Sequence, residues 1–263
     1  MSSITHIAPA AFTDPNKVKL YLDPVMNKGS VFLFDFLNPM SNPNPDDAVV
    51  ADGTTYKNLV EGGGDGVFQQ LGSGYPVRAL AGKQGLQTAG QTGGNSLSAN
   101  LSLGNPAPTA DKAFMASLWF KSNGVAVAGT GHLLGDAVAV NGATGTTQWA
   151  WSLFAGEADT AQASQRLVGA TALTAGPGPA SKAVRQLALS WNAGQLTFYI
   201  NGAVVASVAG IPSPIGATGR SPFIAFQRPG TYYRAYMERL DLSGRSALAA
   251  VQAEYAANNA RFA

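Results

Sequence analysis

The two carboxylates whose spacing best fits hydrolytic chemistry are Glu157 and Asp159. Cleavage of a glycosidic bond needs one carboxyl group that donates a proton and a second that is ionised. Side chains two positions apart on a strand point to the same side, as such a pair requires. This pair, however, follows Gly156 and leads into the polar stretch TAQASQ, which is typical of a loop. We therefore predict polar surface residues here rather than a catalytic pair.

Histidine chemistry is limited to His6 and His132, the two histidines of the chain. His132 lies in the Gly-rich stretch GTGHLLGD, four residues before Asp136, and no Gly-x-Ser-x-Gly motif supplies a nucleophilic serine. The chain has no cysteine, which excludes disulfides, thiolate ligands and a thiol nucleophile, and two distant histidines alone argue against zinc. Since no set of catalytic residues emerges, we predict that the protein is not an enzyme.

Aromatic side chains offer binding chemistry, because their rings stack on the C–H faces of sugars and anchor protein contacts. Trp119 and Tyr199 lie on strand-like segments and are the first candidates for ligand binding, although most tryptophans of a β-sandwich are core residues. In TYYRAYMERLDL, strand alternation places Tyr232, Arg234 and Tyr236 on one face beside a glutamate. That combination favours a protein contact surface over a nucleic-acid site, because the acidic group dilutes the positive charge.

The composition favours contacts with other proteins. Charged residues make up 12% of the chain, against a usual share of roughly 25%. A surface this poor in charge is expected to be covered by neighbours, so we predict a homo-oligomer. The net charge of +2 argues against nucleic acid as the main partner. No apolar run is long enough to insert into a membrane, and no secretory signal is recognisable at the N-terminus.

Strand signals with turn residues between them, and no alternating helices, predict an antiparallel β-sandwich. FMASLWFK alternates Phe, Ala, Leu and Phe on one face with Met, Ser, Trp and Lys on the other. In residues 196–208, Asn201-Gly202 fits a two-residue type I′ turn, in a register that pairs Phe198 with Val205. The second face of this hairpin is less apolar, which suggests partial cover by a loop, an arm or another chain.

The chain divides into three predicted parts. Residues 1–50 contain Asp-Pro, Asn-Pro and Pro-Asn-Pro and are interpreted as an extended N-terminal arm, with an ordinary first strand in SVFLFDFL as the alternative. Residues 51–245 hold the sandwich, and residues 246–263 form a C-terminal helix that Ser243 or Ser246 can cap. The apolar face of this helix is expected at steps of three, four and seven, on Leu248, Val251, Tyr255 and Phe262.

The stretch LALSWNAGQLTFYINGAVVASVAG, followed by RAYMERLDLSGRS, resembles the laminin G-like and pentraxin-like branch of the concanavalin A-like jelly rolls. Trp191, Gly194 and the Tyr-Ile-Asn-Gly of the hairpin carry this resemblance. It implies a jelly-roll sandwich that serves in glycan hydrolysis, calcium-assisted binding or structural adhesion. Glucanases of this fold carry Glu-x-Asp-x-x-Glu, whose third acid is missing after Asp159, where Gln162 stands nearby.

The same resemblance implies that calcium can bind at one rim of the sandwich. Calcium takes six to eight oxygen ligands, often from loop carbonyls and a few carboxylates or amides. The candidates in the corresponding region are Asp136, Asn141 and Asp159, with ordinary turn-forming residues as the alternative. No other cofactor is expected.

The C-terminal LDLSGRSALAAVQAEYAANNARF, together with the arm-like N-terminus, is similar to sandwich proteins from the virions of tailed bacteriophages. This similarity and the low charge predict a non-enzymatic virion component, at the tail tip, the baseplate or the capsid surface. It would be made in the host cytoplasm and would contact copies of itself and other virion proteins. The alternative is a lectin-like carbohydrate-binding module that contacts a glycan on the host cell surface.

Overall fold

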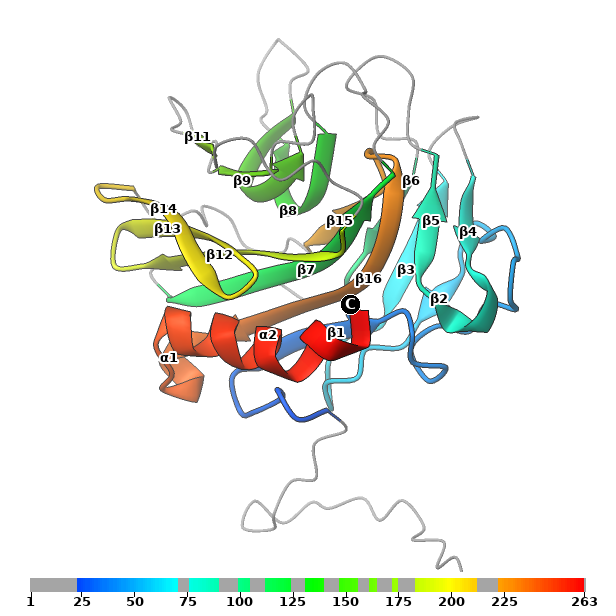
Figure 1. Ribbon diagram of the computed structural model, residues 1–263, viewed down its shortest axis with the longest axis horizontal. Coiled ribbons are helices and arrows are strands. Elements are labelled where there is room, and N and C mark those ends of the chain that lie inside the picture. The colour runs from blue at the N-terminus through cyan, green and yellow to red at the C-terminus, as the bar shows by residue number, and fades with distance from the viewer. Residues whose placement is uncertain are drawn as a thin grey trace, which may run out of the picture.

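Two antiparallel β-sheets, which we call sheet A and sheet B, face each other, and helix α2 (Ala247–Phe262) covers the other side of sheet A (Figure 1). This arrangement confirms the predicted all-β antiparallel sandwich with a C-terminal helix. The computed structural model describes residues 23–70, 76–89, 99–104, 112–123, 131–139, 147–155, 161–164, 172–174, 183–211 and 222–262.

Sheet A has the strand order β14-β13-β12-β7-β16-β5-β4, and β1 pairs with the second half of β16. Its strands are β1 (Ser30–Asp35), β4 (Val77–Ala79), β5 (Leu86–Thr88), β7 (Phe114–Ser122), β12 (Arg185–Asn192), β13 (Gln195–Ile200), β14 (Ala203–Val208) and β16 (Gly230–Arg239). Two short helical turns complete this half of the fold, η1 (Ala81–Lys83) and α1 (Leu240–Ser243).

Sheet B has the strand order β11-β10-β9-β8-β15-β6-β3-β2. Its strands are β2 (Thr55–Tyr56), β3 (Gly66–Gln70), β6 (Ala99–Ser102), β8 (Gly131–Ala139), β9 (Thr147–Ala155), β10 (Ala161–Ser164), β11 (Ala172–Thr174) and β15 (Phe223–Ala225). Strands distant in sequence pair directly, since β15 lies between β8 and β6.

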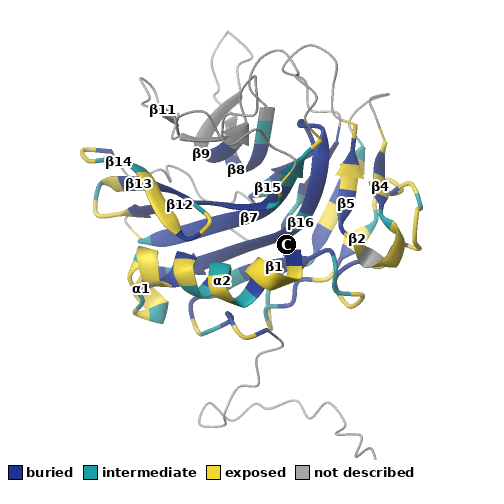
Figure 2. Ribbon diagram, viewed as in Figure 1, coloured by how far each residue is buried: buried dark blue, intermediate teal, exposed yellow. Residues whose placement is uncertain are grey.

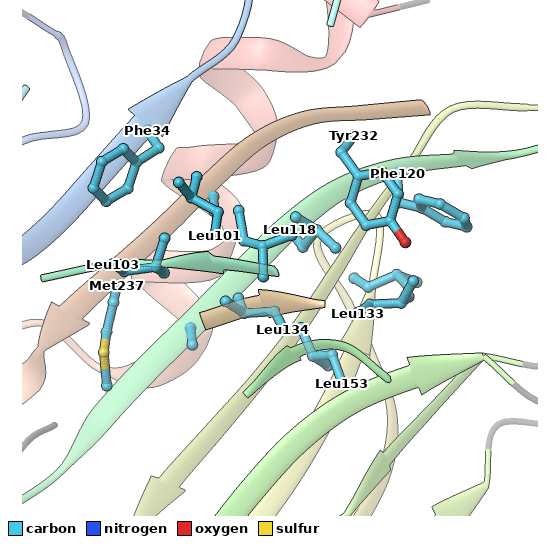
Figure 3. Packing of buried hydrophobic residues seen from close by; sticks show 14 of the residues in the cluster. Phe34, Leu101, Leu103, Leu118, Phe120, Leu133, Leu134, Leu153, Tyr232 and Met237 are labelled. Atoms are coloured by element: carbon cyan, nitrogen blue, oxygen red, sulfur yellow. The ribbon is translucent and has the colours of Figure 1, made fainter. Parts of the chain in front are cut away.

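The main hydrophobic core fills the space between the two sheets (Figure 3). Leu118 and Met237 of sheet A and Leu134 and Leu153 of sheet B belong to this core, and all four side chains are fully buried. Each such burial contributes about 1.5–3 kcal/mol to folding, so this layer supplies much of the stability that holds the sheets in register.

A second hydrophobic core lies between sheet A and α2, where Met115, Tyr199 and Val251 are buried. Figure 2 shows the outward side of α2 exposed and the strands beneath it buried. The alternation predicted for FMASLWFK is confirmed, but its second face is buried as well because α2 covers it. The helix also covers part of the hairpin, where Tyr255 packs at Gly202.

Helix α2 begins after Ser246, whose Oγ accepts a hydrogen bond from the backbone N–H of Ala249 at 3.2 Å, as an N-cap does. The buried side agrees with the prediction at Val251 and Phe262 and differs from it at Leu248. Leu248 is 39% exposed, whereas Glu254 and Asn258 are buried. The apolar pattern did not predict these two buried polar residues, because Glu254 is paired with Arg234 of β16 and Asn258 donates a hydrogen bond to Glu254.

The hairpin has the predicted turn, with φ of 51° at Asn201 and 78° at Gly202. The pairing shifts beyond Tyr199, so Phe198 lies opposite Ala206 and not opposite Val205. Val205 is the extra residue of a β-bulge, which the local sequence did not indicate.

Within the predicted N-terminal arm, Ser30–Asp35 form β1 of sheet A, as in the alternative of an ordinary first strand. Residues 1–22 lie outside the described residues, and the division at residues 50 and 245 stays a prediction. In the part of the chain that the structure describes, no helix has the length and apolar character needed to cross a membrane.

Candidate functional site

The outer side of sheet B carries a strip of polar side chains around one aromatic ring. We call it the polar face of sheet B, and it comprises Thr55, Val67, Gln69, Asn100, Ser102, His132, Ser152, Phe223 and Gln227. Six strands of sheet B and the turn after β15 contribute to it.

Strand pairing places these residues side by side. Val67 lies opposite Ser102, and Ser102 lies opposite Phe223, which in turn lies opposite Gly135. Gly135 pairs with Ser152 on the next strand. Directly paired residues share a face of the sheet, so one continuous row crosses β3, β6, β15, β8 and β9.

Alternation along each strand assigns this row to the outer side. Phe68, Leu101, Ile224 and Leu153 belong to the core between the sheets. Their sequence neighbours therefore point the other way. The exposure of Val67, at 39%, agrees with this assignment.

His132 and Ser152 form a hydrogen-bonded pair at one end of the polar face. The Nδ1 atom of His132 lies 2.8 Å from Oγ of Ser152, and the backbone N–H of His132 donates to Oε1 of Gln227 at 2.7 Å. Ser152 is fully buried, whereas His132 is half-buried. These bonds fix His132 beside the row. A buried serine hydroxyl is poorly placed to attack a substrate, so this pair is best understood as a positioning contact.

Asn100 provides an unsatisfied acceptor on the same face. It lies opposite Gln69 on β3 and Ala225 on β15, and it is 9% exposed. Its Oδ1 atom is buried and has no hydrogen-bond partner. Buried polar atoms nearly always have one, and leaving one unpaired costs about 1–3 kcal/mol. Because this atom has no exposed surface, it is not open to a ligand on the polar face.

The chemistry available on the polar face is that of hydrogen bonding and stacking. Amides, hydroxyls and an imidazole both donate and accept hydrogen bonds, and Phe223 adds a half-buried ring. Gly135 and Ala225, which also lie on this face, have no large side chain. Sugars present hydroxyls and C–H faces, so this set of groups fits a carbohydrate better than a metal or a phosphate.

The five residues predicted for ligand binding do not lie on this face. Trp119, Tyr199, Tyr232, Arg234 and Tyr236 are all buried, with at most 3% of each residue exposed. The Trp119 ring stacks on Tyr255 of α2 with the ring planes 3° apart, which leaves no open surface for a sugar.

Tyr232 and Arg234 do not share a face, in contrast to the prediction from alternation. The pairing with β7 shifts between these two residues, so Tyr233 is an extra residue in β16. Such a bulge reverses the alternation. Tyr232 therefore packs between the sheets, whereas Arg234 and Tyr236 point toward α2 and the segment before β1.

Arg234 is the centre of a buried ion cluster. Its guanidinium binds Asp23 through both Nη atoms, at 2.7 and 3.0 Å, and Asp35 at 3.1 Å. Its Nε donates to Glu254 of α2 at 2.8 Å, and Glu254 also accepts from Nε1 of Trp119 at 2.7 Å. The cluster joins the segment before β1, β1 itself, β16 and the helix.

Asp23 and Arg234 stabilise each other's charged forms. Burial raises the pKa of Asp23, but the hydrogen bond and positive charge of Arg234 outweigh it, so the pKa is lowered overall. Burial lowers the pKa of Arg234, and the carboxylates of Glu254, Asp23 and Asp35 more than reverse this effect. The cluster therefore has a structural role, because its ion pair with Glu254 holds α2 against sheet A.

Tyr236 belongs to a second polar cluster near α1. Its hydroxyl lies 2.9 Å from Oε2 of Glu238, which also binds Arg245. Burial and the neighbouring carboxylate of Glu238 raise the pKa of Tyr236, so this tyrosine is neutral at physiological pH. The arrangement fixes the end of β16 and presents no surface to a ligand.

The predicted calcium ligands are not brought together among the described residues. Asp136 is buried on β8, opposite the core residue Trp151. Asn141, Asp159 and Glu157 lie outside the described residues. Within the described ranges no three acidic or histidine side chains form a metal-binding group, and calcium binding stays a prediction.

The residues of the polar face were missed because they are common surface types. GVFQQ, ANLSL and PFIAFQ each alternate polar with apolar residues, which shows that one side of each strand faces away from the core. Nothing in these short patterns shows that the three strands are neighbours.

No protein-family model and no curated protein matches the sequence, but solved structures share its fold. Trypanosoma rangeli sialidase has a TM-score of 0.56 and 15% identity, over 88% of this chain and 33% of that one. The same sialidase in complex with sialic acid has a TM-score of 0.54 at 14% identity, again over 88% and 33%. The receptor binding domain of botulinum neurotoxin D has a TM-score of 0.53 at 10% identity, over 87% and 52%.

These similarities establish a shared β-sandwich fold. The chain spans about a third of the sialidase and about half of the toxin chain. The prediction that the protein is not an enzyme is contradicted, because sialidases are enzymes that contain this fold. The virion role receives no support from these neighbours.

Proposed function

We propose that the chain is a lectin-like carbohydrate-binding module and that the polar face of sheet B holds its sugar site. The observation that carries the proposal is the row of hydrogen-bonding side chains around Phe223, in which Gln69 is exposed.

Two neighbours support a binding role of this kind. The sialidase has been solved with sialic acid, a sugar, and the toxin domain carries the name of a receptor binding domain. The fold alone does not transfer a function, since it hosts several. The proposal therefore depends on the polar face itself.

The test is a glycan array probed with the full chain, followed by calorimetry on the strongest glycan. Gln69 is exposed on the polar face, and Gln69→Ala should weaken binding about tenfold, which corresponds to one hydrogen bond of about 1–1.5 kcal/mol. Gln87→Ala is the matched control, because Gln87 is an exposed strand glutamine on sheet A. The proposal fails if the array shows no binding, or if both substitutions weaken it equally.

The aromatic ring is tested separately with Phe223→Leu. Leucine keeps most of the apolar volume but cannot stack on a sugar ring, which should cost about 0.5–1.5 kcal/mol of binding. Unchanged binding, with unchanged thermal stability, would remove Phe223 from the site.

A contact role in an assembly, as in a virion component, is a second candidate, and the edge of sheet A favours it. Strand β14 ends the sheet and carries no charged residue, and Val204 and Val205 are 53% and 42% exposed. Uncharged edges of this type pair readily with other chains, although the bulge at Val205 restricts the pairing. Sedimentation should show an oligomer that Val204→Lys dissociates and Val67→Lys, on sheet B, does not. A monomeric wild-type chain would exclude self-association.

A further inference from the structure

The charges around the polar face of sheet B bear on which sugars it binds. We infer that this face selects uncharged glycans over sialylated or otherwise anionic ones. The inference rests on the proposed function, and it differs from what a solved complex with sialic acid would suggest for the fold.

The described residues of the polar face carry no lysine or arginine. Carboxylates in proteins are bound most strongly by arginine, through charge-assisted and often bidentate hydrogen bonds. Neutral amides and hydroxyls, such as those of Gln69, Asn100 and Ser102, form hydrogen bonds with neutral sugar hydroxyls. These hydrogen bonds need no charge on the ligand. A carboxylate placed on the described residues of this face would lose its water without gaining a cation from them.

Two cations among the described residues lie close to the polar face in the chain, and both are engaged elsewhere. Arg228 follows Gln227 but is 5% exposed, and its charge acts on Tyr232 in the interior of the sandwich. Lys57, two residues after Thr55, is in an ion pair with Asp65 at 3.1 Å.

Among the described residues, Asp52 adds a negative charge next to β3. Asp52 is exposed and accepts a hydrogen bond at 2.8 Å from the backbone N–H of Gln70, the residue after Gln69. A carboxylate at this position opposes the approach of an anionic sugar, because like charges in a binding interface are unfavourable.

The experiment compares the strongest neutral glycan of the array with the same glycan carrying a terminal sialic acid, by calorimetry on the full chain. We expect sialylation to weaken binding at least tenfold at about 20 mM salt, and less at about 500 mM salt, where charge interactions are screened. Asp52→Asn keeps an acceptor for the N–H of Gln70 and removes the charge. It should reduce the discrimination at low salt and leave binding of the neutral glycan unchanged.

The outcomes separate the two proposals. Tighter binding of the sialylated glycan, or an array that contains only anionic ligands, would overturn the inference while the carbohydrate-binding function stands. Equal affinity for both forms would also overturn it. Absence of binding to every glycan would refute the proposed function itself, and the inference with it.

Discussion

The buried ion cluster gives the sharpest test of how α2 is held on sheet A. In Arg234→Met the side chain keeps its length and apolar stem but loses the charge and the four hydrogen bonds to Asp23, Asp35 and Glu254. Three carboxylates then remain in a site from which Arg234 excluded water. Asp35 retains one cation, Arg261, at 2.9 Å.

The magnitude follows from the cost of leaving buried charges uncompensated. Removing one partner of a buried ion pair costs about 3–5 kcal/mol. The loss of unfolding free energy is smaller than three times this value, because the carboxylates can take up protons and Glu254 keeps Trp119 and Gln186 as donors. An expected loss of about 3–5 kcal/mol is a large part of the 5–15 kcal/mol that stabilises a typical domain.

The assay is urea unfolding at pH 7, followed by tryptophan fluorescence, with midpoint and slope fitted together. Arg78→Met is the matched control, since Arg78 is exposed and makes one long contact, 3.4 Å to the backbone oxygen of Asp47. It should change stability by less than about 0.5 kcal/mol. The reasoning is refuted if Arg234→Met also costs less than about 1 kcal/mol.

Three further predictions concern stability. The pKa values of Asp23 and Glu238 are lowered in the folded state, so these ionised groups stabilise the fold above their ordinary pKa values, 3.8 and 4.5. Chemical denaturation between pH 7 and pH 3 should therefore show that the free energy of unfolding begins to fall only below about pH 5. Ser246→Ala removes the cap of α2 and should cost about 1 kcal/mol, whereas Ser246→Asp should restore most of it in the same unfolding assay. Gly202→Ala should cost about 1–2 kcal/mol, because φ is +78° and the added methyl group would lie 3.2 Å from Tyr255; no change in melting temperature would argue against strain there.

Local features of the fold could be predicted because they depend on neighbouring residues only. The Asn201-Gly202 turn follows from the ease with which these two residues adopt positive φ. The buried faces of β7 follow from a period of two, and the cap of α2 follows from a serine before a helical run. None of these inferences required knowledge of a distant segment.

The predictions that failed were those that assumed unbroken local patterns. A single extra residue at Tyr233 moved Tyr232 to the opposite face from Arg234. On α2, Leu248 is exposed although it is apolar. Glu254 is buried because Arg234 of β16 supplies the opposite charge that makes this burial favourable.

The candidate site was invisible to the sequence for the same reason. Strand pairing places Phe223 beside Ser102 and Gly135, which are 121 and 88 positions away in the chain. The sequence by itself determined that the chain forms short alternating strands, tight turns and one terminal helix, because side-chain period and turn propensity are local properties. The tertiary structure decided which strands adjoin, which polar groups are buried and which face remains polar, because these depend on pairing between segments that no local pattern specifies.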